Sequence, residues 1–282
     1  MKHVVPQAIH DSEARLRAPK CRPGTRLKEL SAIRKWPTST KKFWSKREKK
    51  FLWVSGEEQC GKSAVLGTLA DEYHGEGSLA AGFFFSQNCA LTKTNLLATL
   101  AYQIAHHPNI PPGIKSLIAS SFKKNPLVFT KEFSLQLETL LFGPVKLHYR
   151  TTGSPTWPKY IVIDALDECA LPIPGESFPE TSTPAARDNQ VAILRSLIDR
   201  ALDDTFPFRF IISTRPHDLI AKVFAKKSTA AITTTLVLAP IEINWEDTRS
   251  ILSHEYAPSV LSMSMDSHEI HRNGRDISMQ RE

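Results

Sequence analysis

A loop between residues 54 and 67 has the residue types and the spacing that bind phosphate. The stretch VSGEEQCGKSAVLG contains the pattern G-x-x-x-x-G-K-S, with an apolar run before it and a helical pattern after it. In this arrangement backbone amides and the lysine hold the phosphates of a nucleotide, and the serine hydroxyl binds magnesium. We therefore predict a phosphate loop made of Gly56, Glu57, Glu58, Gln59, Cys60, Gly61, Lys62, Ser63 and Ala64, with Ser63 as a magnesium ligand.

The interior of this loop is unusual for a nucleotide site. Glu57 is expected to face outward, but Glu58 would lie near the phosphates, so its repulsion has to be offset by solvent, Lys62 or magnesium. Gln59 stands where such loops often have glycine, and a positive φ would cost it about 1–2 kcal/mol. We expect this strain to weaken nucleotide binding about tenfold rather than to abolish it.

Acidic residues and one arginine follow two later apolar runs. The segment YIVIDALDE (160–168) ends on carboxylates: Asp164 is expected to hold magnesium, and Asp167 or Glu168 to orient or deprotonate a water that attacks the terminal phosphate. Spacing does not separate the last two, although Glu168 has the longer reach. Arg215 follows the run FIIST and is expected at the same edge, where it would sense the terminal phosphate or stabilise charge during transfer.

Buried strands and helices alternate along the chain and would position these groups. Uninterrupted apolar strands separated by helices indicate a parallel sheet covered on both faces, and hence a three-layer α/β fold. The predicted strands are 51–55, 80–86, 160–168, 208–216 and 233–241. The predicted helices are 62–73, 94–107, 113–125, 131–143 and 189–204. The proline-rich connections 144–158 and 171–188 are predicted to be surface loops.

Composition limits the class of protein. The 282 residues are 41% hydrophobic, which supplies a large core, and the four cysteines form no C-x-x-C pair. We expect reduced thiols, a cytoplasmic location and no membrane span, because no secretory signal and no apolar run of ~18 residues is visible.

Charge divides the chain into three predicted regions. Residues 1–50, a basic lead-in, hold 15 Lys and Arg against four Asp and Glu, whereas the remaining residues carry a net charge of −4. We interpret the run KKFWSKREKK (41–50) as a solvated connector without specific nucleic-acid binding, because no nucleic-acid-binding fold signature accompanies it. Residues 51–256 are predicted to form the α/β domain, and 257–282 a disordered tail.

The motifs GKS, DALDE and STRP, in this order and at these distances, resemble the NACHT group of the STAND class of P-loop NTPases. The fungal branch with nephrocystin-3-like N-terminal domains is the most similar, over residues 10–255, and the lead-in 18–36 is similar to that of basidiomycete NACHT proteins. Ala165 also fits this group. AAA-type ATPases usually have glutamate directly after the metal-binding aspartate, whereas NACHT domains place their further acids later, as this chain does. Gly24, Thr25 and Arg26 match loosely the element that holds adenine.

The resemblance implies a P-loop NTPase fold that binds ATP or ADP, or GTP, with Mg. It also implies slow hydrolysis in a signalling switch that contacts other protein chains and self-associates when ATP binds. Relatives continue into helical, winged-helix and repeat regions, so this chain is expected to be a truncated or minimal member. Two other readings remain open: a nucleotide-binding scaffold without hydrolysis, and a kinase, although no arginine-bearing lid is recognisable.

Overall fold

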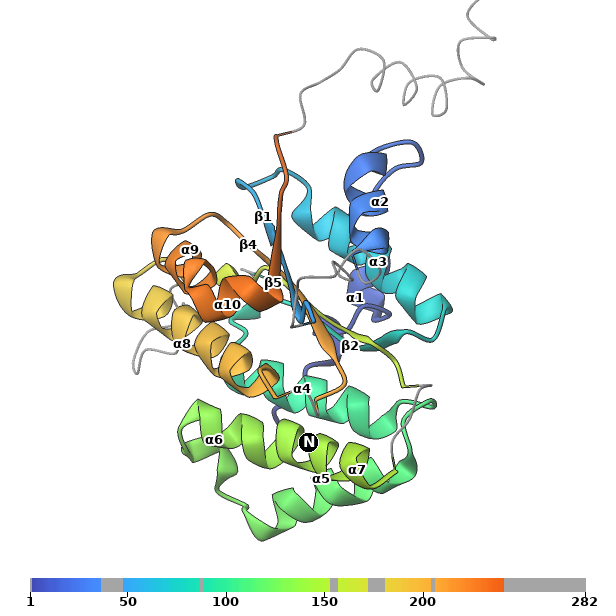
Figure 1. Ribbon diagram of the computed structural model, residues 1–282, viewed down its shortest axis with the longest axis vertical. Coiled ribbons are helices and arrows are strands. Elements are labelled where there is room, and N and C mark those ends of the chain that lie inside the picture. The colour runs from blue at the N-terminus through green and yellow to red at the C-terminus, as the bar shows by residue number, and fades with distance from the viewer. Residues whose placement is uncertain are drawn as a thin grey trace, which may run out of the picture. The chain divides into compact units, whose positions relative to one another are not determined.

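A sheet of five parallel strands lies at the centre of the structure (Figure 1). The computed structural model describes residues 2–36, 48–86, 89–152, 157–171, 181–203 and 206–240, which belong to a compact unit of residues 1–240. The predicted tail and most of the basic run 41–50 lie outside the described residues. The strands are β1 (Phe51–Ser55), β2 (Leu79–Phe84), β3 (Tyr160–Asp164), β4 (Arg209–Thr214) and β5 (Thr233–Val237).

The strand order is β2-β3-β4-β1-β5, and every pairing is parallel. Strands β1 to β3 are buried throughout, and β4 is buried except at its first residue, as their continuous apolar sequences predict. Because all strands point the same way, their carboxyl ends meet at one edge of the sheet. The phosphate loop after β1, the acids after β3 and the arginine after β4 are therefore brought to the same edge.

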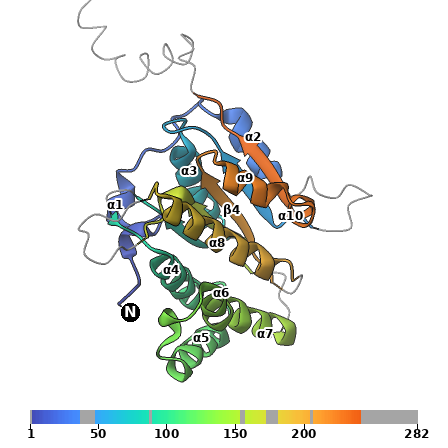
Figure 2. The ribbon, with the colours of Figure 1, turned by 90° about the vertical axis from the view of Figure 1, so that its left-hand side faces the viewer.

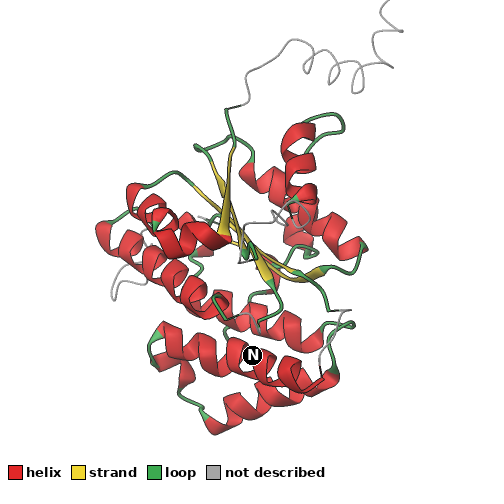
Figure 3. Ribbon diagram, in the orientation of Figure 1, coloured by secondary structure: helices red, strands yellow, loops and turns green. Residues whose placement is uncertain are grey.

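Helices cover both faces of the sheet, which confirms the predicted three-layer α/β fold (Figures 1 and 2). Alternate residues of β1 enter different cores: Phe51 and Trp53 join the core with α4, α8 and α9, and Leu52 and Val54 join the core with α2 and α3. Figure 3 shows how these helices surround the strands. The helices are α1 (Glu13–Leu16), α2 (Leu27–Lys35), α3 (Lys62–Gly75), α4 (Lys93–His106), α5 (Pro112–Lys124), α6 (Phe133–Leu137), α7 (Gly143–Thr152), α8 (Pro184–Ala201), α9 (Asp218–Ala225) and α10 (Lys227–Ile232).

The first proline-rich connection is a helix over much of its length, so the prediction of a surface loop at 144–158 was wrong there. A π-helical turn, Glu138–Phe142, joins α6 to α7, and the Gly143 N–H bonds to the Glu138 carbonyl. Pro144 has no N–H to give, and the lengthened turn lets the helix continue past it. Gly143 is required as well, because a Cβ there would lie 2.6 Å from the Glu138 oxygen.

The second proline-rich connection is shorter than predicted. Helix α8 begins at Pro184, inside the expected loop 171–188, and the Thr183 hydroxyl accepts a hydrogen bond from the Ala186 N–H. Proline suits this first helical position because its missing N–H would have no partner within the helix. Helix α8 therefore starts directly after its N-cap, Thr183, in a segment whose prolines had predicted a loop.

Part of the basic lead-in belongs to the apolar core. Leu30, Ile33 and Trp36 are buried with the residues of α3, and the backbone N–H of Cys21 donates to the Thr68 hydroxyl on that helix. Sequence patterning did not single out α2. Among the described residues, no helix is both long enough and apolar enough to cross a membrane.

Candidate functional site

The phosphate loop joins β1 directly to α3, and glycine is required at both of its ends. A Cβ on Gly56 would lie 2.5 Å from the Cys60 sulfur and 2.8 Å from the Leu238 carbonyl oxygen. Gly61 adopts a φ of 87° at the start of α3, which favours glycine. None of the described side chains caps this end of α3, so its first amides are available to an anionic ligand.

Gln59 has a φ of 61°, which confirms the positive value expected from the sequence. The surrounding loop is fixed by the protein's own contacts, including the buried Cys60 and the bonds from Lys62 described below. Because those contacts impose the conformation without a ligand, we replace the roughly tenfold loss of affinity expected from the sequence: the strain at Gln59 should oppose folding more than nucleotide binding.

Replacing Gln59 by glycine is expected to raise the free energy of unfolding by about 0.5–1 kcal/mol, because glycine adopts positive φ without steric cost. Nucleotide affinity should change by less than about twofold. Chemical denaturation and titration calorimetry test both values, with Gln59→Ala as a control that keeps the steric cost. A tenfold gain in affinity at unchanged stability would show that the strain instead opposes binding.

Lys62 lies at the base of the loop, with 9% of its surface exposed. Its ammonium nitrogen donates to the carbonyl oxygens of Gly56 and Glu57, each at 2.7 Å. These contacts hold the charge inside the turn, where it can attract phosphate oxygens.

Asp164 is almost fully buried at the end of β3, with 1% of its surface exposed. Burial raises the pKa of Asp164, while its hydrogen bond with Ser213 and the nearby Ser63 hydroxyl act in the opposite direction. Ser63 follows β1 and Asp164 ends β3, so the two predicted magnesium ligands lie near each other although β4 separates their strands.

Ser213 is a site residue that sequence reasoning missed. Its hydroxyl donates to Asp164 Oδ1 at 2.6 Å and accepts a hydrogen bond from the Ala165 N–H at 2.8 Å. Ala165 has a φ of 53°, so Ser213 fixes both the acid and the turn that follows it. The available signal was a hydroxyl residue directly after the apolar run FII within a buried strand.

Arg215 connects three carboxylates at the mouth of the site. Its Nε lies 3.1 Å from Asp167 Oδ2, and its backbone N–H donates to Asp167 Oδ1. Its guanidinium also lies 3.0 Å from Glu58 and 3.7 Å from Glu168. Burial raises the pKa of Asp167, while the contacts with Arg215 favour its ionised form. The three residues predicted for catalysis therefore lie together.

A pocket of about 360 Å³ lies between the loop and this acidic turn. Its lining includes nine predicted site residues: Glu58, Gln59, Gly61, Lys62, Ser63, Ala64, Asp167, Glu168 and Arg215. Pro19 and Ala165 also line it and were not predicted. The other predicted members of the loop, Gly56, Glu57 and Cys60, and the acid Asp164 are not part of this lining.

Arg26 and Thr25 lie elsewhere. The Arg26 guanidinium donates to the carbonyls of Cys60 and Ala239, both at 2.8 Å, and the Thr25 hydroxyl donates to the Arg22 carbonyl. Neither residue lines the pocket, so their contact with adenine stays a prediction. The Arg26 side chain supports the phosphate loop by bonding to the backbone carbonyl of Cys60.

Arg15, in α1, is another residue near the site that sequence reasoning missed. Its guanidinium lies over the Phe84 ring at 4.1 Å, and burial lowers its pKa while attraction to Asp164 acts in the opposite direction. The lead-in thus brings a positive charge toward the acid at the end of β3. No motif in the sequence indicated this role.

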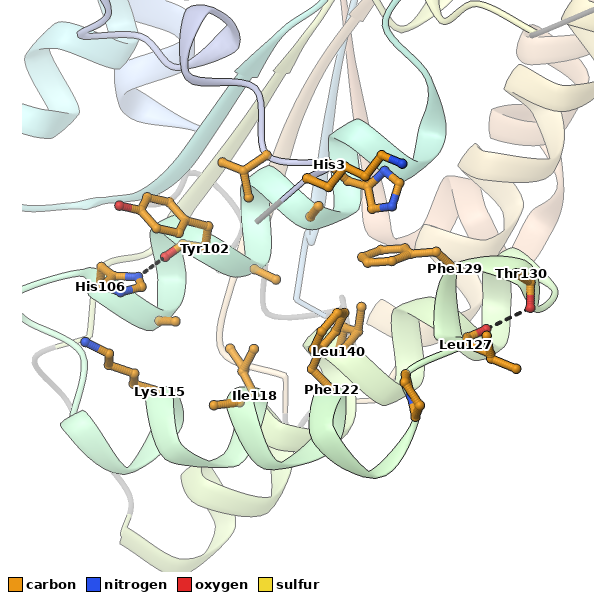
Figure 4. A pocket seen from close by; sticks show the side chains of 17 residues that line it. His3, Tyr102, His106, Lys115, Ile118, Phe122, Leu127, Phe129, Thr130 and Leu140 are labelled. Atoms are coloured by element: carbon orange, nitrogen blue, oxygen red, sulfur yellow. Dashed lines mark hydrogen bonds between the residues drawn. The ribbon is translucent and has the colours of Figure 1, made fainter.

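A larger cavity of about 460 Å³ lies on α4 and α5 (Figure 4). Phe122, Phe129 and Leu140 form apolar walls, and His106 and Lys115 lie toward one end. Its described lining contains neither a glycine loop nor a carboxylate, so the predicted phosphate and magnesium chemistry belongs to the smaller pocket.

Comparison with known proteins identifies one family. A family model described as "Nephrocystin 3, N-terminal" matches residues 33–215, and no curated protein matches the chain. The solved Aeropyrum pernix ORC2 protein is similar at 12% identity and a TM-score of 0.42, over 78% of this chain and 48% of that one. A chain of the E. coli MS115-1 HORMA:CdnC:Trip13 complex is also similar, at 12% identity and a TM-score of 0.36. The match covers 81% of this chain and 64% of that one. This chain therefore spans about half the length of the first and less than two thirds of the second.

Proposed function

Because the chain belongs to the nephrocystin 3 N-terminal family of P-loop NTPase domains, we propose that it binds ATP with magnesium and hydrolyses it slowly. The observation that carries this proposal is the pocket of about 360 Å³, which the phosphate loop lines together with the acids after β3 and the arginine after β4. These groups follow strands whose carboxyl ends meet at one edge of the sheet. ADP, and GTP in place of ATP, would use the same phosphate-binding groups.

Groups that line the pocket, together with Asp164 beside it, fit a magnesium nucleotide. Lys62 supplies a buried positive charge, and the uncapped start of α3 supplies backbone amides for phosphate oxygens. Ser63 and Asp164 are the residues that would hold magnesium, since a hydroxyl and a carboxylate are oxygen ligands of the kind it prefers. When bound, magnesium would neutralise charge on the phosphates.

The acids at the pocket mouth have different surroundings. Asp167 is engaged twice by Arg215, through its backbone N–H and its Nε. We assign Asp167 to positioning Arg215, whose charge would stabilise the terminal phosphate during transfer. Glu168 lies 3.7 Å from the guanidinium and remains the residue assigned to accept a proton from the attacking water.

Glu168→Gln is expected to bind ATP with parental affinity but to lower single-turnover hydrolysis at least about a hundredfold, because the amide cannot accept the proton. Asp167→Asn, in contrast, should weaken ATP binding in addition to lowering turnover, because it removes the charge that holds Arg215 in place. Quenched-flow turnover and calorimetry separate the two effects. Parental turnover in Glu168→Gln, together with loss of turnover in Asp167→Asn, would reverse the assignment.

A second candidate function is a nucleotide-binding scaffold that does not hydrolyse ATP. It is favoured by the carboxylates around Arg215, which engage the group that transfer would need. Titration with ADP, ATP and GTP, followed by a turnover assay, distinguishes the two. A filled ATP site without turnover would support the scaffold.

The family resemblance also supports a cytoplasmic signalling switch that rests with ADP and self-associates with ATP through protein contacts. Light scattering of the full chain with magnesium and either nucleotide tests this proposal. An unchanged molecular mass with saturating ATP would contradict it.

A further inference from the structure

Glu58 places a negative charge inside the phosphate pocket and pairs with Arg215. The Glu58 carboxylate lies 3.0 Å from one terminal nitrogen of the Arg215 guanidinium. Both residues line the same pocket, together with Lys62 and Ser63. The pair therefore links the phosphate loop to the end of β4 across the space in which phosphates would lie.

We propose that Glu58 is a specificity-determining residue that selects against the triphosphate by competing with the terminal phosphate for Arg215. This inference rests on the proposed function of the site. A terminal phosphate that reaches Arg215 has to displace the Glu58 carboxylate, whereas a diphosphate ends before that group. Glu58 therefore lowers affinity for ATP more than affinity for ADP.

The other partners of Arg215 indicate why Glu58 is the displaceable one. Asp167 engages Arg215 through one hydrogen bond from its backbone N–H and one ion pair with its Nε, and the Asp167 side chain is 14% exposed. Among the described residues, Glu58 makes one ion pair, with Arg215, and its side chain is 58% exposed. An exposed single contact is screened by solvent and is weaker than a paired one. The terminal phosphate would thus exchange with Glu58 while Asp167 keeps Arg215 in place.

The test compares affinities for Mg-ADP and for a non-hydrolysable Mg-ATP analogue in Glu58→Gln. We expect the analogue to bind about three- to fivefold more tightly, the upper part of the range for an exposed ion pair, with ADP affinity changed by less than about twofold. The gain should shrink at high salt. Circular dichroism confirms that the exposed substitution leaves the fold intact.

Two further variants separate competition for Arg215 from general repulsion. Glu57→Gln removes the same charge from the neighbouring exposed position and should change the ratio of analogue to ADP affinity less than Glu58→Gln does. In an Arg215→Gln background the preference gained by Glu58→Gln should disappear. An equal gain for ADP and analogue, an equal effect of Glu57→Gln, or a gain that persists without Arg215 would overturn the proposal.

The experiment also distinguishes this inference from the proposed function. A parent that binds neither nucleotide contradicts nucleotide binding itself, and the inference is overturned with it. A parent that binds both, with an unchanged ratio in Glu58→Gln, overturns the role of Glu58 alone.

Discussion

Lys62→Ala should lower ATP affinity at least about a hundredfold, because charged hydrogen bonds to phosphate contribute about 1.5–3 kcal/mol each. The Lys62 ammonium lies at the base of the phosphate loop, held by the carbonyls of Gly56 and Glu57. Titration calorimetry with Mg-ATP measures the loss.

Lys62→Met is the control for packing, since it keeps most of the buried stem and removes only the charge. It should lose as much affinity as Lys62→Ala and unfold at a temperature nearer that of the parent. Binding of ATP by either folded variant with parental affinity would contradict the site assignment.

Asp164→Asn should weaken Mg-dependent ATP binding and, at neutral pH, stabilise the protein without nucleotide. Burial raises the pKa of Asp164, so ionisation is less favourable in the folded protein than in the unfolded chain. The parent therefore loses stability as pH rises from the unfolded pKa through the raised folded value. The neutral amide removes this cost and can still accept the hydrogen bond from Ser213.

Denaturation of parent and variant at about pH 4 and pH 7.5 tests this linkage, since the stability gain should be larger at the higher pH. Asp199→Asn, on the exposed side of α8, is the matched control and should alter neither stability nor ATP affinity. A variant less stable than the parent at pH 7.5 would show that the carboxylate stabilises the fold.

The sequence allowed the sheet and most of the site to be predicted for physical reasons. Continuous apolar runs had to be buried on both faces, and parallel strands had to bring their carboxyl ends to one edge. Asp164, Asp167 and Arg215 follow such runs directly, so their meeting at that edge could be foreseen. The positive φ of Gln59 followed equally from its place in the loop.

Features that depend on distant side chains or on an irregular turn could not be predicted. The pairing of Glu58 with Arg215 requires a side-chain geometry that no local pattern encodes. Pro144 normally ends a helix, and only the π-helical turn before it permits α7. Arg15 comes near enough to Asp164 to be attracted by its charge through the packing of the lead-in, which carries no recognisable motif.

The guanidinium of Arg26 connects three separate segments of the chain. It is bonded at once to the Cys60 carbonyl in the phosphate loop, to the Ala239 carbonyl after β5 and to the Glu29 side chain on α2. Any displacement of the loop would have to break one of these bonds or move its partners as well. The guanidinium therefore ties the position of the phosphate loop to the backbone directly after β5 and to α2.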